Sequence, residues 1–195
     1  MTESSKPRVA GLLLAAGGSS RLGRPKQLVE FEGKTLIRRS AESLIGAGCY
    51  PVLVVLGSET ERSKKELNSL ELNTVENQDW ESGMSSSIRV GLDRLLTGEP
   101  SLDGVLITLC DQPRVTADKL KPFLEKFAAE HASIVAAEYD GVIGVPALFA
   151  RDMFDALLNL TGDKGARELI RQHEHAASID LPEAALDVDT PSNLP

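Results

Sequence analysis

Residues 12–26 read Leu-Leu-Leu-Ala-Ala-Gly-Gly-Ser-Ser-Arg-Leu-Gly-Arg-Pro-Lys. An apolar run that is typical of a buried strand passes directly into a glycine-rich loop with spaced cations. Glycines let backbone N–H groups approach an anion closely, and Arg21, Arg24 and Lys26 can neutralise its charge. We therefore interpret this segment as a phosphate cradle and expect a nucleoside triphosphate as its ligand.

The spacing of this glycine loop differs from that of the two best-known phosphate loops. Gly23 is followed by Arg24 and Pro25 rather than by the Lys-Ser/Thr of a Walker loop, and the chain contains no Gly-x-Gly-x-x-Gly. A P-loop ATPase and a dinucleotide dehydrogenase are therefore both disfavoured. The structural alternative is a tight strand-to-helix connection whose cations are simply solvated.

Short β-branched runs alternate with longer amphipathic segments along the chain. Runs at 9–14, 52–56, 105–109 and 134–137 are typical of strands that are buried on both faces. Apolar residues recur at helical spacing in 35–47, 59–67, 85–96, 117–130, 152–160 and 166–172. The pattern predicts a three-layer, Rossmann-like α/β fold, with a mostly parallel central sheet and helices on both faces.

Composition favours one compact domain without extracellular features. A chain of 195 residues can bury roughly 70% of its unfolded surface, so we expect a single domain at 8–195 after a short tail at 1–7. The net charge of −8 disfavours binding to nucleic acid or to an anionic membrane. The N-terminus lacks a signal peptide, and Cys49 and Cys110 are expected to be reduced thiols, so the predicted location is the cytoplasm.

Two of the expected strands end immediately before polar segments. Leu14 precedes the glycine loop, and Leu109 lies just before Asp111. In open α/β sheets, ligands bind at the carboxyl ends of parallel strands near a switch in strand order. We therefore expect the glycine loop and Asp111 to face the same crevice, as a Mg²⁺ triphosphate requires.

Asp111 is the first candidate for a metal ligand, because Mg²⁺ prefers one or two carboxylates together with phosphates and water. Capping of the following turn or helix is the structural alternative for this residue. Asp187 and Asp189 lie two residues apart, so in an extended segment they would point to one side and could complete a metal site. The segment also reads as a helix start with Pro191 just inside it, and both interpretations stay open.

Gly83 and the serines that follow it are typical of a helix N-terminus, where hydroxyl and N–H groups could bind a base or an anion. A serine N-cap without a ligand is the structural alternative. Trp80 precedes this segment, and we favour its packing beneath a loop over a place in the nucleotide pocket.

Five motifs occur in the order known from one enzyme family. They are the glycine loop, Gly83-Met84-Ser85-Ser86-Ser87-Ile88, Leu109-Cys110-Asp111-Gln112-Pro113, Gly162-Asp163-Lys164-Gly165-Ala166-Arg167 and Asp187-Val188-Asp189-Thr190-Pro191. Together they span nearly the whole chain. The sequence resembles the MobA-like nucleotidyltransferases, and more narrowly the molybdenum cofactor cytidylyltransferase group.

This resemblance implies Mg²⁺-dependent transfer of CMP from CTP to the phosphate of a molybdopterin-type cofactor, with release of pyrophosphate. It implies catalytic roles for Arg21, Lys26 and Asp111, and metal binding by Asp111, Asp187 and Asp189. The implied nucleotide-binding residues are Leu14, Ala15, Ala16, Gly17, Gly18, Arg21, Lys26, Gly57, Asn77, Gly83, Ser85, Ser86 and Asp111. The implied acceptor-binding residues are Gln112, Pro113, Gly144, Pro146, Asp163, Lys164 and Arg167.

Two positions depart from the family pattern. Val145 stands where relatives often carry histidine between glycine and proline, and Leu22 replaces the usual methionine. The first change removes a polar side chain beside the expected acceptor pocket. Two alternatives therefore remain: transfer involving another base or a sugar or polyol phosphate, and a non-catalytic protein that binds the molybdenum cofactor and delivers it. A molybdenum hydroxylase is the client that cytidylyl transfer to the molybdenum cofactor, or its delivery, would imply.

Overall fold

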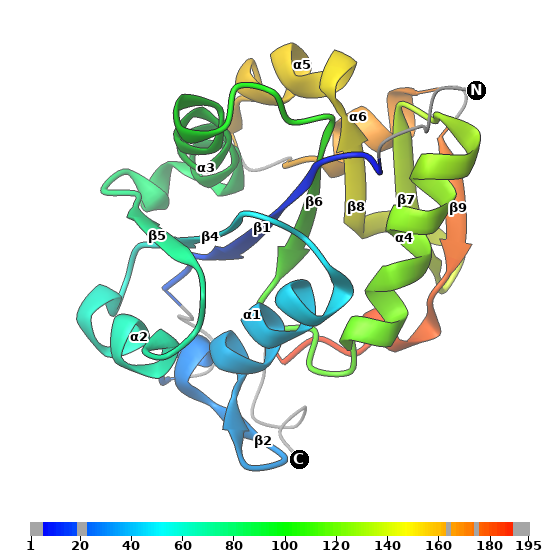
Figure 1. Cartoon of the computed structure of the whole chain (residues 1–195). Coiled ribbons are helices and arrows are strands. Elements are labelled where there is room, and N and C mark those ends of the chain that lie inside the picture. Colours follow the sequence, from blue (N-terminus) through cyan, green and yellow to red (C-terminus); the bar gives the residue numbers. More distant parts are fainter. Residues whose placement is uncertain (1–5, 19–22, 163–164, 174–175, 189–195) are drawn as a thin grey trace.

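The computed structural model describes residues 6–18, 23–162, 165–173 and 176–188. Its main sheet contains β1 (Val9–Ala15), β4 (Val52–Leu56), β5 (Asn73–Glu76), β6 (Gly104–Leu109), β7 (Ile134–Tyr139), β8 (Val142–Ala150) and β9 (Ala177–Asp180). These strands lie in the order β5-β4-β1-β6-β8-β7-β9, which Figure 1 shows from one edge to the other. All neighbouring pairs are parallel except those that β8 makes with β6 and β7. The expectation of a mostly parallel sheet is therefore confirmed.

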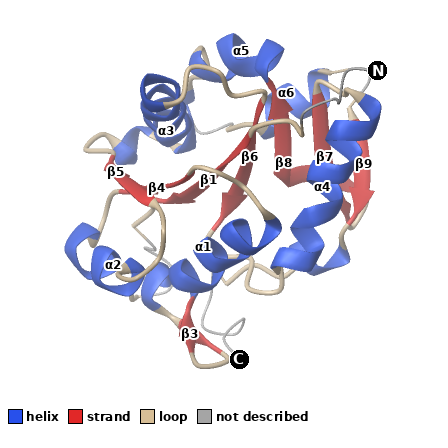
Figure 2. Ribbon diagram, viewed as in Figure 1, coloured by secondary structure: helices blue, strands red, loops and turns tan. Residues whose placement is uncertain are grey.

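Helices cover both faces of this sheet. They are α1 (Leu36–Ala47), α2 (Thr60–Leu67), α3 (Met84–Gly98), α4 (Ala117–Glu130), α5 (Phe154–Leu158) and α6 (Arg167–Gln172). Short 3₁₀ helices occupy Lys26–Leu28 (η1), Trp80–Ser82 (η2), Arg151–Met153 (η3) and Pro182–Ala185 (η5). Figure 2 shows α1, α2 and α4 on one side of the sheet and α3, α5 and α6 on the other. None of the helices described is long and apolar enough to cross a membrane.

The alternation of side chains along each strand builds a separate hydrophobic core on each face. On β1, Leu13 packs into the core beneath α1 and α4, whereas Leu12 and Leu14 pack into the core beneath α3 and α5. Both faces of the central strands are apolar for this reason, which explains their continuous hydrophobic sequences. The result is the three-layer α/β architecture predicted from the sequence.

The strand order reverses between β1 and β6. From β1 the chain proceeds to β4 and β5 on one side, and then crosses to β6 on the other side. β1 and β6 pair in parallel, with Leu14 opposite Leu109. The loops that follow these two strands therefore begin side by side at the carboxyl ends of the strands. This is the position expected for a ligand site at a switch in strand order.

Most of the expected elements form within one to three residues of their predicted ends, and Gly48 ends α1 with a left-handed φ of 93°. Segment 152–160 forms η3 followed by the short helix α5, rather than one helix. The strands β5, β8 and β9 were not predicted. β5 and β9 are short and only partly buried, so they carry a weak hydrophobic signal.

The side chain of Gln27 holds the start of the glycine loop against η1. This residue is fully buried. Its Nε2 donates to the carbonyl oxygens of Ala15 at 3.0 Å and Gly17 at 2.6 Å. Ser58 Oγ, which follows β4, also donates to the Gly17 carbonyl at 2.9 Å. These bonds satisfy backbone acceptors that the sheet leaves unpaired at the end of β1.

A small hairpin lies below the main sheet in Figure 1, formed by β2 (Glu30–Phe31) and β3 (Lys34–Thr35). Phe31 packs with Val29, Leu36 and Val188 in a third, smaller apolar cluster. Val188 comes from the C-terminal segment, so this cluster joins that segment to the chain that follows the glycine loop. The region beside the crevice therefore has its own core.

We predict opposite effects from two alanine substitutions in α3. A Cβ on Gly91 would lie 2.5 Å from Leu12 Cδ1 and 2.8 Å from Val55 Cγ2, whereas nothing lies within 4 Å of a Cβ on Gly98. Gly91→Ala should lower the free energy of unfolding by about 1–3 kcal/mol, because it overpacks the contact between helix and sheet. Gly98→Ala should raise it by up to about 1 kcal/mol. Urea unfolding measures both values, and equal stability of the two variants would contradict the close approach of α3.

A second prediction concerns Gln27. In Gln27→Glu a buried carboxylate would face two carbonyl oxygens, so the free energy of unfolding should fall by more than about 2 kcal/mol. Gln27→Met keeps the shape and loses the hydrogen bonds, so a loss of about 1–3 kcal/mol is expected. The exposed Gln78 provides the matched control, because Gln78→Glu should change stability by less than about 0.5 kcal/mol. Wild-type stability of Gln27→Glu in urea would show that the amide does not hold the loop.

Candidate functional site

An ion pair joins the loop that follows β1 to the loop that follows β6. Lys26, in η1 after the glycine loop, donates from Nζ to Asp111 Oδ2 at 2.5 Å. The Lys26 side chain is 20% exposed and that of Asp111 is 11% exposed, so both side chains are mostly buried but still in contact with solvent. The sequence expectation that these residues face one another is therefore met by the geometry of β1 and β6.

The second carboxylate oxygen of Asp111 has a different environment. Among the described residues, Asp111 Oδ1 is buried and has no hydrogen-bond partner. A buried anionic oxygen without a partner is unfavourable, and a cation would satisfy it. The donor set available at this point, carboxylate oxygen beside a place for phosphate and water, suits Mg²⁺ or Mn²⁺.

The C-terminal segment that carries Asp187 is joined to residue 111 through the backbone. The N–H of Val188 donates to the carbonyl oxygen of Asp111 at 2.9 Å. Val188 is buried in the small core with Phe31, whereas Asp187 is exposed. Within the described part of the chain, no group of three or more histidine, cysteine, aspartate or glutamate side chains could hold a metal by itself.

The loop at residues 111–113 is fixed from outside the crevice by Arg39 of α1. Arg39 Nε donates to the Pro113 carbonyl oxygen at 2.6 Å, and Arg39 Nη2 pairs with Glu32 Oε2 at 2.8 Å. The same guanidinium carbon lies 5.1 Å from the centre of the Phe31 ring. Sequence reasoning missed Arg39, because nothing in the pattern of α1 shows which of its charged residues turns towards the loop.

The side chain of Gln112 crosses from this loop to two other segments. Its Nε2 donates to the carbonyl oxygens of Ala184 at 2.9 Å and Val145 at 3.2 Å, and the residue is 2% exposed. Gln112 thus holds the Gly144-Val145-Pro146 segment through a backbone oxygen. That contact is independent of the side chain at 145, so the change from histidine to valine leaves this support intact.

Tyr139 is a further polar residue beside the same segment, and the sequence analysis did not select it. Its hydroxyl donates to the Val145 carbonyl oxygen at 3.3 Å, and a Cβ on Gly144 would lie 3.1 Å from that hydroxyl and 3.8 Å from Arg167 Nε. Burial raises the pKa of Tyr139, and the charge of Asp187 raises it further, against the opposing effect of Arg167. Tyr139, Arg167, Asp187 and Gln112 therefore form a polar group on the β8 side of Asp111.

On the β4 side, the serines at the start of α3 have internal partners. Asn77 Nδ2 donates to Ser86 Oγ at 2.8 Å and to Ser87 Oγ at 3.0 Å, while Asn77 Oδ1 accepts from the Asp79 N–H at 3.0 Å. Ser86 Oγ in turn donates to the Gly83 carbonyl oxygen at 2.8 Å. Asn77 and Ser86 therefore shape the segment between β5 and α3. Ser85 is also buried, and its Oγ has no partner within the described residues.

Four of the predicted site residues lie outside the described residues: Arg21, Asp163, Lys164 and Asp189. Of the others, Leu14, Ala15 and Ala16 are buried at the end of β1, and Gly17 and Gly18 are exposed. Gly57 directly follows β4, and Trp80 packs against it. A Cβ added to Gly57 would lie 2.8 Å from Trp80 Cγ. Among the predicted nucleotide residues, Gly57 follows β4 and Asn77 follows β5, whereas the predicted acceptor residues Gly144 and Pro146 lie on β8.

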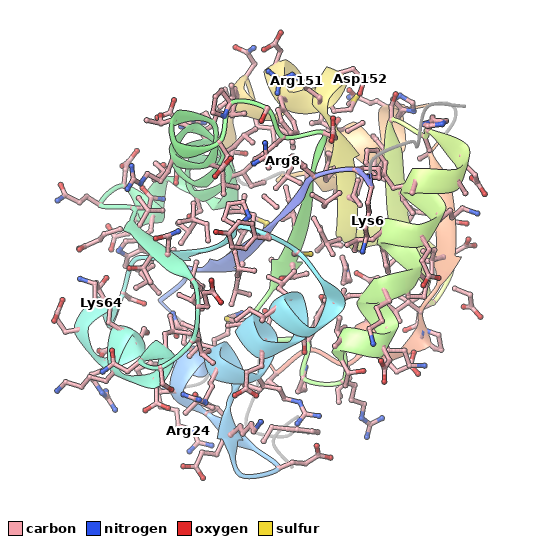
Figure 3. All side chains as sticks on the ribbon, viewed as in Figure 1. Lys6, Arg8, Arg24, Lys64, Arg151 and Asp152 are labelled. Carbon is pink, nitrogen blue, oxygen red and sulfur yellow. The ribbon has the colours of Figure 1, made fainter. Side chains whose placement is uncertain are left out.

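A separate cavity of about 390 Å³ lies at the opposite, amino ends of β1 and β6, and its lining includes Asp103, Arg151 and Asp152. Figure 3 shows Arg8, Arg151 and Asp152 at that end and Arg24 at the end near the hairpin. The charged side chains of this cavity have structural partners: Asp152 accepts from Ser133 at 2.6 Å, and Arg151 donates to the Leu102 carbonyl oxygen at 2.9 Å. We therefore place the candidate site at the carboxyl ends of β1 and β6.

Several related proteins match almost the full length of the chain. Nicotine blue oxidoreductase of Paenarthrobacter nicotinovorans is 32% identical, over 97% of this chain and 96% of that protein. Purine catabolism protein PucB of Bacillus subtilis is 27% identical, over 95% and 93%. Molybdenum cofactor cytidylyltransferase of Escherichia coli is 22% identical, over 94% and 92%.

Solved structures agree with this picture. The crystal structure of Rv0371c from Mycobacterium tuberculosis has a TM-score of 0.83 and 28% identity, covering 97% of this chain and 96% of that chain. A complex of Rv0371c with manganese has a TM-score of 0.79 and 27% identity, covering 95% of each chain. Residues 11–177 match the family described as the MobA-like NTP transferase domain. The chain described here therefore belongs to the MobA-like NTP transferase family.

Proposed function

We propose that the protein is a Mg²⁺-dependent nucleotidyltransferase that transfers CMP from CTP to the phosphate of a molybdopterin-type cofactor and releases pyrophosphate. The observation that carries this proposal is the Lys26–Asp111 pair at the reversal of strand order, directly beside the glycine loop. A triphosphate needs a cation and backbone N–H groups on one side and a metal ligand on the other. Lys26, the glycine loop and Asp111 are the groups proposed to supply this combination.

In this proposal the chain acts mainly by positioning and by electrostatic stabilisation, as is general for phosphate-group transfer. Lys26 and Arg21 bind the β- and γ-phosphates, and the residues from Leu14 to Gly18 present backbone groups to the nucleotide. Asp111 binds the metal, together with Asp187 or Asp189. The bound Mg²⁺ would neutralise phosphate charge as pyrophosphate leaves. The Oδ1 atom of Asp111, which is buried and has no hydrogen-bond partner among the described residues, supports its role.

The acceptor is proposed to bind on the β8 side of Asp111. Arg167 is exposed there and suits bidentate contact with a phosphate, and Lys164 and Asp163 belong to the same motif. Gln112 holds the Gly144-Val145-Pro146 segment, and the Pro113 carbonyl accepts from Arg39, so we propose that Gln112, Pro113, Gly144 and Pro146 shape the wall of this region. The hydroxyl of Tyr139 supplies a polar group beside Gly144, although position 145 has lost one.

Four observations support the finer parts of this assignment. The relative from Escherichia coli is named as a molybdenum cofactor cytidylyltransferase, and the Ala15-Ala16-Gly17 form of the loop resembles the cytidylyl group. The manganese complex of Rv0371c supports a divalent metal. Cys49 and Cys110 are both buried and form no disulfide, which is consistent with the cytoplasmic location that we propose.

Asp111→Asn should lower pyrophosphate release by at least about 100-fold, because it removes the carboxylate charge and keeps the shape of the side chain. The assay uses purified protein, Mg²⁺ and CTP, GTP, ATP or UTP, with and without molybdenum-loaded molybdopterin. We expect release only with CTP and this acceptor. Replacement of Mg²⁺ by Mn²⁺ in the same assay tests the choice of metal.

The exposed Asp93 on α3 provides the control, and Asp93→Asn should retain wild-type activity. Near-normal release by Asp111→Asn would remove Asp111 from the mechanism. Pyrophosphate release with another nucleotide, or with a sugar or polyol phosphate as acceptor, would support nucleotidyl transfer but show that the proposed substrates are wrong. Tight binding of the molybdenum cofactor without release for any pair would favour a delivery protein for a molybdenum hydroxylase.

A second candidate function follows from the relative named nicotine blue oxidoreductase, which is 32% identical over 97% of this chain. The same crevice could hold the pyrophosphate of a reduced nicotinamide dinucleotide, which would donate a hydride to a dye acceptor. The chain lacks Gly-x-Gly-x-x-Gly, which argues against this candidate. The glycine loop after β1 would have to bind the pyrophosphate instead.

The two candidates give different results in one spectrophotometric assay. Oxidation of NADH or NADPH by nicotine blue is followed through the absorbance of the reduced nicotinamide. If the protein is a nucleotidyltransferase, this rate should equal that of the reaction without protein, with Asp111→Asn showing no difference. A protein-dependent rate together with no pyrophosphate release would establish the oxidoreductase instead.

A further inference from the structure

The indole ring of Trp80 lies along the carboxyl ends of two neighbouring strands. A Cβ on Gly57, just after β4, would lie 2.8 Å from Trp80 Cγ, near one end of the indole. A Cβ on Gly18, just after β1, would lie 2.6 Å from Trp80 Cη2, at the other end. The long axis of the ring therefore runs from the end of β4 to the glycine loop.

Both glycines are required by this ring rather than by their backbone conformation. Neither Gly18 nor Gly57 has a positive φ, whereas Gly23 does. A side chain at either position would overlap the indole, and at Gly57 it would also come within 2.6 Å of the Ala16 carbonyl oxygen. Part of the glycine signal in the loop thus comes from contact with an aromatic side chain, and not from contact with phosphate.

The carboxyl ends of the central strands can be divided into two halves, one on each side of β1. Lys26 and Asp111 belong to the half between β1 and β6, whereas Trp80 covers the half between β4 and β1. The first half carries charged groups that suit a triphosphate and a metal. The second half presents a half-buried aromatic surface, next to the backbone of the glycine loop. An aromatic surface beside a phosphate site is suited to a planar ring rather than to a charged group.

The backbone around Trp80 is held firmly enough to present this surface. Trp80 begins the 3₁₀ helix η2, and its carbonyl oxygen accepts from the Gly83 N–H at 3.3 Å. Just before it, Asn77 accepts from the Asp79 N–H and donates to two serines of α3. The Trp80 side chain is partly buried and packs against the core beneath α3. The earlier interpretation of Trp80 as a residue packed beneath a loop therefore describes only part of its environment.

We propose that the indole of Trp80 is the stacking surface for the base of the bound nucleotide. This inference rests on the proposed function and adds a residue that selects nucleotides over base-free polyphosphates. Base stacking on an aromatic side chain corresponds to an affinity loss of about 5- to 150-fold when the ring is removed. The effect requires a base, so it should be absent for inorganic tripolyphosphate, which can occupy the charged half alone.

The test compares CTP with inorganic tripolyphosphate, each with Mg²⁺, by isothermal titration calorimetry. Trp80→Leu should weaken CTP binding about 5- to 150-fold and change tripolyphosphate affinity less than about twofold. Trp80→Phe keeps an aromatic ring and should retain most of the CTP affinity. The control is Tyr50→Leu, which removes an exposed aromatic ring from the far end of β4 and should leave both affinities unchanged.

Trp80 is the only tryptophan in the chain, so the wild-type protein gives an independent measurement. CTP should change the tryptophan emission, and tripolyphosphate at saturation should leave it nearly unchanged. This measurement decides the question even where Trp80→Leu fails to fold, because it needs no variant.

The outcomes separate this inference from the proposed function. Unchanged CTP affinity in a folded Trp80→Leu variant, or equal losses for both ligands, would overturn the stacking role and leave the nucleotidyltransferase standing. An emission unchanged at saturating CTP would do the same. A wild-type protein that binds tripolyphosphate but none of the four nucleoside triphosphates would overturn both proposals.

Discussion

The parallel pairing of β1 with β6 is the constraint on which the rest of the site depends. It joins segments about a hundred residues apart in the sequence and places Leu14 opposite Leu109. The glycine loop and residues 111–113 therefore leave the sheet at the same edge, which lets Lys26 reach Asp111 at 2.5 Å. Because both strands are buried on both faces, a slip in register would disrupt two cores at once.

Around this pair, three segments are held by polar contacts to the backbone rather than by catalytic groups. Gln27 holds the glycine loop, Arg39 holds residues 111–113, and the N–H of Val188 joins the C-terminal segment to Asp111. The small core of Phe31 and Val188 lies next to these contacts. Pre-organisation of the crevice is thus distributed over residues that would not contact a substrate, which suits a reaction that depends on geometry and charge.

The sequence analysis succeeded where local pattern and tertiary role coincide. Strand 52–56 and helix 117–130 have the predicted bounds, because continuous apolar runs and amphipathic periodicity are local properties. It failed for β9, whose four residues are only partly buried and depend on pairing with β7. Trp80 shows the same limit, since its position between Gly18 and Gly57 joins three separate segments and leaves no periodic signal.

The sequence by itself determined the α/β class, the family and the side chains that form the charged half of the crevice. Those features reside in strand composition, in the glycine loop and in short ordered motifs, each of which is a local property. Only the tertiary structure decided which polar groups are already used internally. Asn77, Ser86 and Gln112 are predicted ligand contacts, and the structure adds that their side chains also form hydrogen bonds to neighbouring segments of the chain. The physical reason is that a buried polar group must find a partner, and the partner depends on segments that the fold alone brings together.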